Sequence, residues 1–335
     1  MTSTPGKPPT VVFRLGHMGD VALTTGVLAR RHEAEADSFI FVTREANGPL
    51  LENHPAVAEV VALSSQQVKE WSRTAAALAD EYRGRDLVDL HGTLRSRLLS
   101  LRWKGAVKRY PKFGLARRLY DRTRLDLFRK RLEATTVPQR YALAFEDAPP
   151  PARDVLPRIF LTDAERKAAA ERLARFSADA PLVALHPYAT HPAKEWPRDH
   201  WKALAGLLDA AGIGWFVVGR SNAPLMPGDP RDQTNATDLR ETCGLLDRAD
   251  RLVTGDSGPM HLACGVSTPV TALFGPTARA WGFYPAGPRD EVLEMDLDCR
   301  PCSLHGKKPC RKGFECMASL TPENVMQAVA DRLNV

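Results

Sequence analysis

Short apolar runs alternate with amphipathic stretches along this chain, and this alternation constrains the fold more than any other feature. In the first half, the apolar runs occupy residues 11–15, 39–43, 57–63, 86–90 and 106–110. Stretches between them, such as 21–31 and 66–83, carry apolar residues at the three- and four-residue spacing of a helix. Strands that alternate with helices form a parallel sheet covered on both faces. We therefore predict a doubly wound, Rossmann-like α/β domain over residues 1–150.

A proline-rich passage marks the boundary to a second domain. Residues 149–157 hold four prolines and interrupt every periodic signal, which predicts a linker. The alternation then resumes, with strands expected at 182–185, 214–218, 251–254 and 269–273 and helices at 162–176, 199–211 and 239–249. The first of these helices carries the capping-box pattern of Thr162 and Glu165. We predict a second doubly wound domain over 151–320, with a central cleft between the two.

The chain ends in one further predicted helix. Residues 322–333 have helical periodicity, with Thr321 as the cap and Pro322 at the first helical position. This places a separate C-terminal helix within residues 321–335.

Positive charge is concentrated in one segment. The formal net charge of the 335 residues is +6, but residues 83–131 hold 16 Lys and Arg against 4 Asp and Glu, a net charge of +12. An anionic partner is therefore expected there. The aromatic residues of the segment are spaced for helix packing rather than for base stacking, which favours phosphorylated or carboxylated material or an anionic membrane face over nucleic acid. A solvated basic helix face is the alternative. The arginines concerned are Arg117, Arg118, Arg122, Arg124 and Arg129.

No segment has the composition of a membrane span. The longest stretch without charged residues, 257–278, contains three prolines and three glycines. The first ten residues contain no apolar run, so we expect no secretory signal. A cytoplasmic setting follows, in which thiols are reduced.

The first candidate functional loop lies between the first predicted strand and the first helix. Ligands of open α/β sheets bind at the carboxyl ends of strands, and Gly16 and Gly19 allow a ligand to approach the backbone there. Asp20 stands at the expected helix start and has two interpretations. It is either an N-cap or a general base that takes a proton from an acceptor hydroxyl.

A second candidate loop, 186–197, follows a predicted buried strand. It contains Thr190, His191 and Lys194 just before a helix. This combination suits phosphate, with Lys194 as a point charge, and the alternative is a solvated surface loop.

A third candidate loop, 255–262, again joins a strand to a helix. Ser257 or Gly258 would open the helix, with Pro259 in its first turn. The free N–H groups at such a start bind anions, and a plain capped turn is the alternative. Asp256 would repel phosphate and is better suited to sugar hydroxyls.

Four cysteines lie within 18 residues, at Cys299, Cys302, Cys310 and Cys316. Four thiolates satisfy tetrahedral zinc, which predicts a structural metal site. The second pair is not a C-x-x-C, so free thiols and disulfides stand as alternatives. The other two cysteines, Cys243 and Cys264, fall in predicted helices as small buried hydrophobes.

Three motifs occur here in a characteristic order. They are Gly16-x-x-Gly19-Asp20-Val21, Lys194-x-Trp196-Pro197, and Asp256-Ser257-Gly258-Pro259-Met260-His261-Leu262 followed by Thr268-Pro269-Val270-x-x-Leu273-Phe274-Gly275-Pro276-Thr277. Over nearly the whole chain this pattern resembles the ADP-heptose:lipopolysaccharide heptosyltransferases, glycosyltransferase family 9. The cysteine tail, with Cys316-Met317 before Leu320-Thr321-Pro322-Glu323, resembles the heptosyltransferase II-like members.

The resemblance implies a GT-B fold, with the acceptor on the N-terminal domain, the donor on the second, and the C-terminal helix returning to the first. It implies a metal-independent, inverting transfer of heptose from ADP-heptose to an anionic inner-core lipopolysaccharide precursor, at the cytoplasmic face of the inner membrane. Asp20 would be the catalytic base and Lys194 would neutralise the donor diphosphate. The other donor-binding residues would be Thr190, Thr237 (on the adenine side), Asp256, Ser257, Gly258, Pro259 and His261. The acceptor-binding residues would be Arg14, Gly16, His17, Gly19, His91, Arg95, Arg117 and Arg118.

One departure from the family pattern concerns the nucleotide. The resemblance implies an acidic residue shortly after the strand ending at Gly219, but 220–228 contains none. Either Asp229 or Asp232 substitutes, or the nucleotide is held differently. The alternatives are therefore a related transferase using another nucleotide sugar, or a non-catalytic nucleotide- or RNA-binding protein. The presence of Asp20 and Lys194 argues against the non-catalytic alternative.

Overall fold

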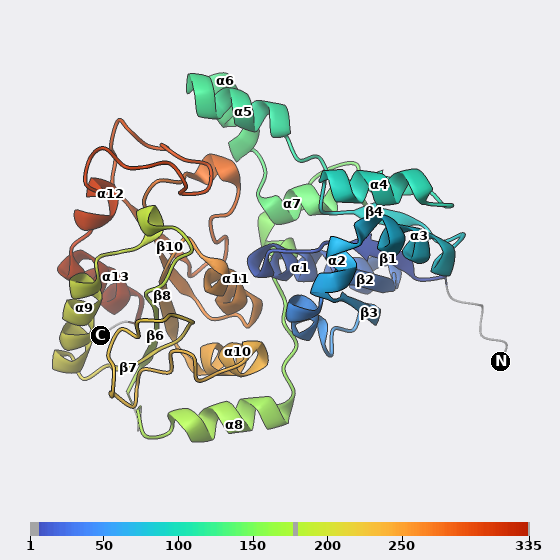
Figure 1. The fold of residues 1–335 in the computed structure, drawn as a ribbon. Coiled ribbons are helices and arrows are strands. Elements are labelled where there is room, and N and C mark those ends of the chain that lie inside the picture. The colour runs from blue at the N-terminus through green and yellow to red at the C-terminus, as the bar shows by residue number, and fades with distance from the viewer. Residues whose placement is uncertain (1–6, 177–179, 334–335) are drawn as a thin grey trace. The chain divides into compact units, whose positions relative to one another are not determined.

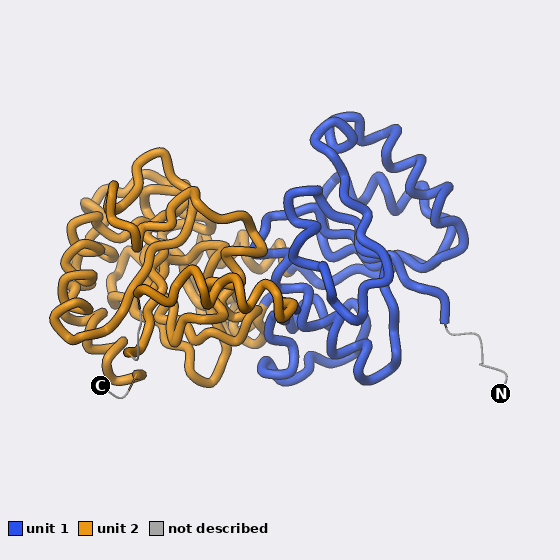
Figure 2. Tube along the Cα trace, turned by 90° about the horizontal axis from the view of Figure 1, so that it is seen from below, with its two compact units in different colours: residues 1–112, 137–160 blue, residues 113–136, 161–335 orange. Residues whose placement is uncertain are grey.

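The chain forms two compact units, shown in Figures 1 and 2. The computed structural model describes residues 7–176 and 180–333. The first unit comprises residues up to 112 together with 137–160, and the second comprises 113–136 together with the residues from 161 onward. The outermost ends of the predicted domains, 1–6 and 334–335, lie outside the described residues.

The first unit contains a five-stranded parallel sheet in the order β3-β2-β1-β4-β5. Its strands are β1 (Thr10–Phe13), β2 (Phe39–Arg44), β3 (Val57–Leu63), β4 (Leu87–Asp89) and β5 (Val107–Arg109). Its helices are α1 (Met18–Glu35), α2 (Ser65–Lys69), α3 (Trp71–Glu81), α4 (Leu94–Arg102) and α7 (Val137–Ala142), with short 3-10 helices η1 (Glu45–Leu51) and η2 (Ala152–Val155). The central strands are apolar along their length because helices cover both faces of the sheet. All five predicted strands are present.

The predicted helix 66–83 is two helices. α2 ends before Glu70, whose backbone (φ −84°, ψ 42°) leaves the helical region, and α3 starts at Trp71. The break lets Trp71 pack on Phe13 of the sheet, with 5.4 Å between the ring centroids. Helical spacing continues through the break, so the sequence pattern did not reveal it.

The proline-rich passage is not a free linker. It forms η2 and packs against α1, where a Cβ on Gly26 would lie only 1.8 Å from the carbonyl oxygen of Leu156. Val155 is fully buried in the same contact. The first unit therefore extends to residue 160, past the expected boundary at 150.

The second unit contains a parallel sheet in the order β10-β9-β8-β6-β7. Its strands are β6 (Leu182–His186), β7 (Gly214–Val217), β8 (Arg251–Gly255), β9 (Val270–Phe274) and β10 (Glu291–Glu294). Its helices are α5 (Gly114–Thr123), α6 (Asp126–Glu133), α8 (Asp163–Leu173), α9 (Arg198–Ala210), α10 (Leu239–Arg248), α11 (Gly258–Gly265), α12 (Glu315–Ala318) and α13 (Pro322–Leu333), with η3 (Pro192–Lys194) and η4 (Arg279–Trp281). The prediction of two doubly wound α/β domains is confirmed. In the described part of the chain, no helix is both long enough and apolar enough to cross a bilayer.

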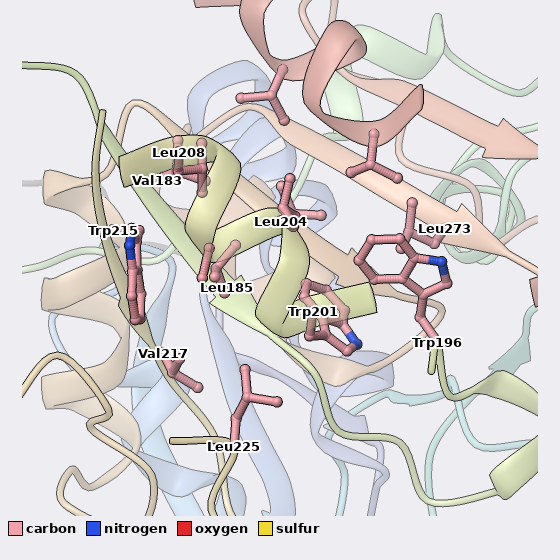
Figure 3. Packing of buried hydrophobic residues seen from close by; sticks show 14 of the residues in the cluster. Val183, Leu185, Trp196, Trp201, Leu204, Leu208, Trp215, Val217, Leu225 and Leu273 are labelled. Carbon is pink, nitrogen blue, oxygen red and sulfur yellow. The ribbon is translucent and has the colours of Figure 1, made fainter. Parts of the chain in front are cut away.

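The core of the second unit forms where α9 packs on the sheet (Figure 3). Trp201, Leu204 and Leu208 lie on one face of α9 and are fully buried with Val183 and Leu185 of β6. Their three- and four-residue spacing directs one stripe of the helix inward.

The C-terminal helix α13 packs on the same core. Val325 and Val329 are completely buried, and α13 contacts α9 and β9. The indole N–H of Trp196 donates to the carbonyl oxygen of Leu320 just before the helix, at 2.7 Å. The helix begins and ends as predicted. It groups with the second unit, whereas the resemblance implied that it returns to the first.

The helical pair α5–α6 also groups with the second unit rather than with residues 1–150. Its inner face contributes Tyr120 and Leu132 to a small core with Ala280 and Trp281 of η4. The rings of Tyr120 and Trp281 lie 5.5 Å apart. Apolar contact therefore fixes the pair to η4.

The start of α8 has the predicted capping box and one additional ion pair. The Glu165 carboxylate accepts from the Thr162 N–H at 2.7 Å, and the Arg240 Nε donates to it at 2.7 Å from α10. These contacts, with the Arg240 hydrogen bond first, lower the pKa of Glu165 to about 2.

We expect Glu165→Gln to lower the thermal midpoint by a few degrees at pH 7, since a capping carboxylate and its partner stabilise by roughly 1 kcal/mol. Because the folded-state pKa lies below the ordinary 4.5, the stabilisation is present above pH 4.5 and is lost as the pH falls toward 2. Thermal melts of both proteins across this range should therefore converge toward acid pH. Glu171→Gln, on the same helix but exposed, is the matched control and should have little effect at either pH.

Candidate functional site

The sheet order of the first unit places a topological switch point between β1 and β4. The strands β2 and β3 are added on one side of β1, while β4 and β5 are added on the other. Open α/β sheets bind ligands at such a switch point, outside the carboxyl ends of the strands. The loop after β1 carries Asp20, and the loop after β4 carries His91.

Asp20 is held from three directions. Its Oδ2 lies 2.6 Å from a guanidinium nitrogen of Arg14 and accepts from the His17 N–H at 3.2 Å. Its Oδ1 accepts from the Tyr141 hydroxyl at 3.5 Å. α1 begins at Met18 with His17 as its N-cap, so Asp20 is the third helical residue and not the cap itself. It therefore contributes to the helix start through a capping box while its side chain stays 17% exposed.

Arg14 is buried rather than open to an acceptor. It is 6% exposed, donates to the Leu90 carbonyl at 2.6 Å and stacks over the Tyr141 ring at 5.5 Å. A buried cation this close to a carboxylate keeps that carboxylate ionised. In the structure Arg14 contacts Asp20, Leu90 and Tyr141, and its role in acceptor binding stays a prediction.

Tyr141 is a functional candidate that sequence reasoning missed. Complete burial raises its pKa well above the usual value, so its hydroxyl stays protonated and donates to Asp20. It comes from α7, far along the chain from Asp20 and outside any recognised motif. No local signal could have found it.

His91 is neutral at physiological pH. Burial, and then the nearby positive charges of Arg14 and Lys112, lower its pKa to about 3. Within residues 7–176 and 180–333, its Nδ1 is buried without a hydrogen-bond partner. A neutral imidazole with one unused nitrogen at the switch point can orient a bound hydroxyl.

The other predicted acceptor residues divide between the two units. Gly16 and exposed His17 lie in the loop with Asp20, and Gly19 is buried within α1. Arg95 is exposed on α4. Both Arg117 and Arg118 lie on α5, in the second unit. The structure thus gathers the β1 and β4 residues at one sheet edge and places the α5 arginines in the other unit.

The second unit has its own switch point, between β6 and β8. β7 lies on one side of β6, while β8, β9 and β10 extend on the other. The loop after β6 carries Lys194, and the loop after β8 carries Asp256 and Ser257. Two of the predicted donor loops therefore meet at one sheet edge.

Lys194 and Asp256 form a mostly buried ion pair. The Lys194 Nζ lies 2.6 Å from Asp256 Oδ2, and their side chains are 16% and 13% exposed. The same carboxylate oxygen accepts from the Thr277 hydroxyl at 2.8 Å. The ammonium is thus fixed beside the start of α11, where an entering anion would meet it.

The start of α11 follows the prediction. Ser257 is the N-cap, Gly258 is the first helical residue and Pro259 lies in the first turn. Below it, the His186 Nδ1 lies 3.2 Å from the Ser257 Oγ and 3.1 Å from the Thr254 Oγ1. Burial lowers the pKa of His186 to about 4, so the ring is neutral and adds no charge to the site. The helix start therefore offers N–H groups and a fixed hydroxyl to an anion.

The remaining predicted donor residues lie on three different segments of the second unit. Thr190 is exposed in the loop after β6, and His261 is buried within α11. Thr237 is buried before α10, with its hydroxyl 2.8 Å from that of Thr242.

The two substitute carboxylates are already engaged within their own loop. Asp229 accepts a hydrogen bond from the Arg231 guanidinium at 2.8 Å, and this contact lowers the pKa of Asp229. Asp232 accepts from the Met226 N–H at 2.7 Å. Both stabilise the loop after β7, so neither is placed as a simple replacement for the implied acidic residue.

The four C-terminal cysteines do not form the predicted zinc site. Among the described residues, which include all four, no group of three or more His, Cys, Asp or Glu side chains is placed to hold a metal ion. The four thiols still lie close enough to interact, because burial and then the neighbouring cysteine thiols raise the pKa values of Cys302 and Cys316. Cys302 points to the Pro276 carbonyl at 3.9 Å, Cys310 accepts from the N–H of Phe314 at 3.3 Å, and Cys316 is buried. Of the three alternatives, the structure shows free thiols.

Comparison with known proteins decides the family. A model of "Glycosyltransferase family 9 (heptosyltransferase)" matches residues 86–311. The chain belongs to glycosyltransferase family 9. The family expected from the three motifs is therefore confirmed.

The chain is similar to a curated family 9 enzyme and to two solved structures. It is 32% identical over 175 residues to lipooligosaccharide heptosyltransferase 2 of Haemophilus influenzae, covering 46% of this chain and about half (50%) of that relative. A family 9 glycosyl transferase from Veillonella parvula superposes with a TM-score of 0.75 at 19% identity, covering 97% of each chain. The Escherichia coli ADP-heptose LPS heptosyltransferase II superposes with a TM-score of 0.71 at 19% identity, covering 98% of this chain and 99% of that one. These superpositions agree with the predicted fold.

The thiol environments predict a clear order of reactivity. Burial raises the pKa of Cys316 to about 11 and that of Cys243 to about 12. Since the thiolate is the nucleophile, iodoacetamide at pH 8 should alkylate the partly exposed Cys299 and Cys310 first, and Cys316 and Cys243 much more slowly. Peptide mass spectrometry against time measures this order.

The same preparation should contain far less than one zinc per chain. Stoichiometric zinc that disappears in Cys299→Ser would contradict the free-thiol assignment.

Proposed function

We propose that this protein is an inverting glycosyltransferase that moves heptose from ADP-heptose to an inner-core lipopolysaccharide acceptor. The observation that carries the proposal is the pair of switch-point sites in a family 9 chain. One presents a held carboxylate, Asp20, and the other presents Lys194 beside a helix start. The donor is argued from the E. coli relative, which is named for ADP-heptose.

The donor diphosphate binds in the second unit. Its oxygens accept hydrogen bonds from the first N–H groups of α11. The Lys194 ammonium, now paired with Asp256, moves to form an ion pair with the same oxygens. Asp256 turns to the sugar hydroxyls, where a carboxylate accepts hydrogen bonds without facing phosphate charge. As ADP leaves, the same lysine and helix start stabilise the growing negative charge.

The acceptor is activated in the first unit. Asp20 takes the proton of the acceptor hydroxyl while that oxygen forms a bond to the anomeric carbon. The bond from this carbon to the phosphate oxygen breaks, and ADP departs with the electron pair. Attack opposite the leaving group inverts the anomeric centre. Arg14 and Tyr141 hold the Asp20 carboxylate in position before the reaction.

The acceptor is an anionic glycolipid precursor at the cytoplasmic face of the inner membrane. The positive segment 83–131 supports this partner class over nucleic acid, because its aromatic residues Trp103 and Tyr120 are buried rather than free to stack on bases. The enzyme then associates with the membrane peripherally. Catalysis needs no metal because Lys194 and the helix start supply the positive charge.

A related transferase with another nucleotide sugar is the second candidate. It is favoured by one observation, the engagement of Asp229 and Asp232 within their own loop, which leaves the implied ribose contact unassigned. The two candidates differ in the nucleotide they bind.

We expect Asp20→Asn to lower kcat by at least roughly 10²-fold, since the amide cannot accept the proton. The affinity for ADP should be unchanged, because the proposed donor residues belong to the other unit. Single-turnover kinetics and calorimetric ADP binding measure the two effects. Asp80→Asn, at an exposed site, is the matched control. Full turnover in Asp20→Asn would refute the assignment of the base.

We expect the protein to bind ADP more tightly than GDP or UDP. Lys194→Gln should weaken ADP binding by roughly 10- to 100-fold, because a charge-assisted contact is lost and Asp256 is left facing the phosphates. Lys202→Gln, exposed on α9, is the control and should bind like the parent. Titration calorimetry with the three nucleotides gives the order. A preference for GDP or UDP would support the second candidate.

A further inference from the structure

Exposed leucines are concentrated in one part of the chain. Among the described residues, six large hydrophobic side chains are exposed: Leu94, Leu101, Leu115, Leu125, Leu127 and Phe314. Five of these six lie between residues 94 and 127, with exposed fractions from 56% to 82%. Single exposed leucines are ordinary on a protein surface, whereas exposed leucines that recur along one segment indicate an interaction surface.

The same residues lie within the most positive segment of the sequence. Residues 83–131 carry a net charge of +12 while the rest of the chain sums to −6. Apolar and cationic side chains are therefore exposed together. Neither the switch-point sites nor the cores use these leucines.

On α5, helix geometry separates the two faces. Ala116 and Tyr120 are buried against η4. Exposed Leu115, Arg118 and Arg122 follow one another at three- and four-residue spacing along the outer face. Because the inner face already supplies the core contact, Leu115 has no packing role within the unit.

On α6, the arrangement is the same. Leu132 is fully buried on the inner side, whereas Leu127, Lys130 and Arg131 are exposed at the same helical spacing. Leu125 is exposed at the N-cap between α5 and α6, which lie side by side (Figure 1). The outer surface of the pair is thus leucine and basic side chains together.

On α4, in the first unit, the pattern recurs. Leu99 and Ser96 are fully buried, and Leu94, Arg97 and Leu101 are exposed on the other side of the helix at spacings of three and four. The same combination of chemistries therefore appears on a helix with a different packing partner.

We propose that the outer face of α4 in the first unit and the outer face of α5–α6 in the second each bind the surface of an anionic phospholipid bilayer, with their exposed leucines inserted among the headgroups and their basic side chains on the phosphates. Helices with interleaved leucine and Arg/Lys are suited to this interface. Each cationic side chain near an anionic membrane adds attraction that salt screens. A nucleic-acid backbone would use the charge but not the leucines. The inference extends the proposed function by naming the element that meets the membrane, and it does not require catalysis to be correct.

Vesicle flotation with the full chain tests the proposal. The parent should float with vesicles of phosphatidylcholine and phosphatidylglycerol, much less with phosphatidylcholine alone, and less at high salt. Leu→Ser at all five positions should weaken partitioning by at least roughly ten-fold, since each leucine loses its buried hydrocarbon. Phe314→Ser, at the exposed large hydrophobic outside the segment, should float like the parent.

A charge variant tests the contribution of the basic side chains. Arg122→Gln with Lys130→Gln should weaken binding to the anionic vesicles and flatten its dependence on salt. Lys167→Gln with Lys202→Gln removes two exposed charges elsewhere in the same unit and should retain binding. Equal binding of the five-leucine variant and the parent would overturn the proposal. Equal losses in the two charge variants would also overturn it, because the attraction would then be to net charge alone.

Activity on a soluble, deacylated acceptor separates this proposal from the proposed function. The five-leucine variant should keep parental turnover there, because the leucines lie outside the sites at β1 and β6. Loss of vesicle binding with intact turnover supports the membrane surface, while absent turnover in the parent would count against the proposed function alone. Preferential binding of single-stranded RNA over anionic vesicles by the parent would overturn the membrane assignment in favour of nucleic acid.

Discussion

The parallel pairing of β1 with β4 and of β6 with β8 is the constraint on which both sites depend. In each sheet the chain adds strands in one direction and then in the other, so each of these two pairs is a topological switch point, where open α/β sheets bind ligands. The loops at these points carry Asp20, His91, Lys194 and Asp256. Buried strands without polar alternation make this possible, because helices must then cover both faces and the loops are left for chemistry.

The charged residue at each switch point is held in an ion pair. Asp20 lies against buried Arg14, and Lys194 lies against Asp256. Charges so far removed from water are stable only when paired, and the pairing also fixes their positions before a ligand arrives. Neutral histidines, His91 and His186, stand beside the two pairs without adding charge because burial lowers their pKa values. Both sites are therefore preorganised, the first around the anionic side chain of Asp20 and the second around the cationic side chain of Lys194.

Positive charge and exposed leucines occur together in one segment of the chain. The net charge of the whole chain is only +6, but the segment 83–131 carries +12 and includes five exposed leucines. The apolar residues on the inner faces of α4, α5 and α6 pack in the cores. The leucines on their outer faces do not contribute to core packing. A lipid surface accounts for both chemistries at once.

Local patterns in the sequence determined the strands, the capping box of Thr162 and Glu165, the start of α11 at Gly258 and the family motifs. These features depend on residues close together in the chain, where periodicity and capping chemistry operate. Tertiary structure alone decided the contact of Tyr141 with Asp20, the packing of α13 and of the proline-rich passage, and the arrangement of the four cysteine thiols. Each of these depends on which distant segment lies opposite, and that is settled by packing across the fold rather than by spacing along the chain.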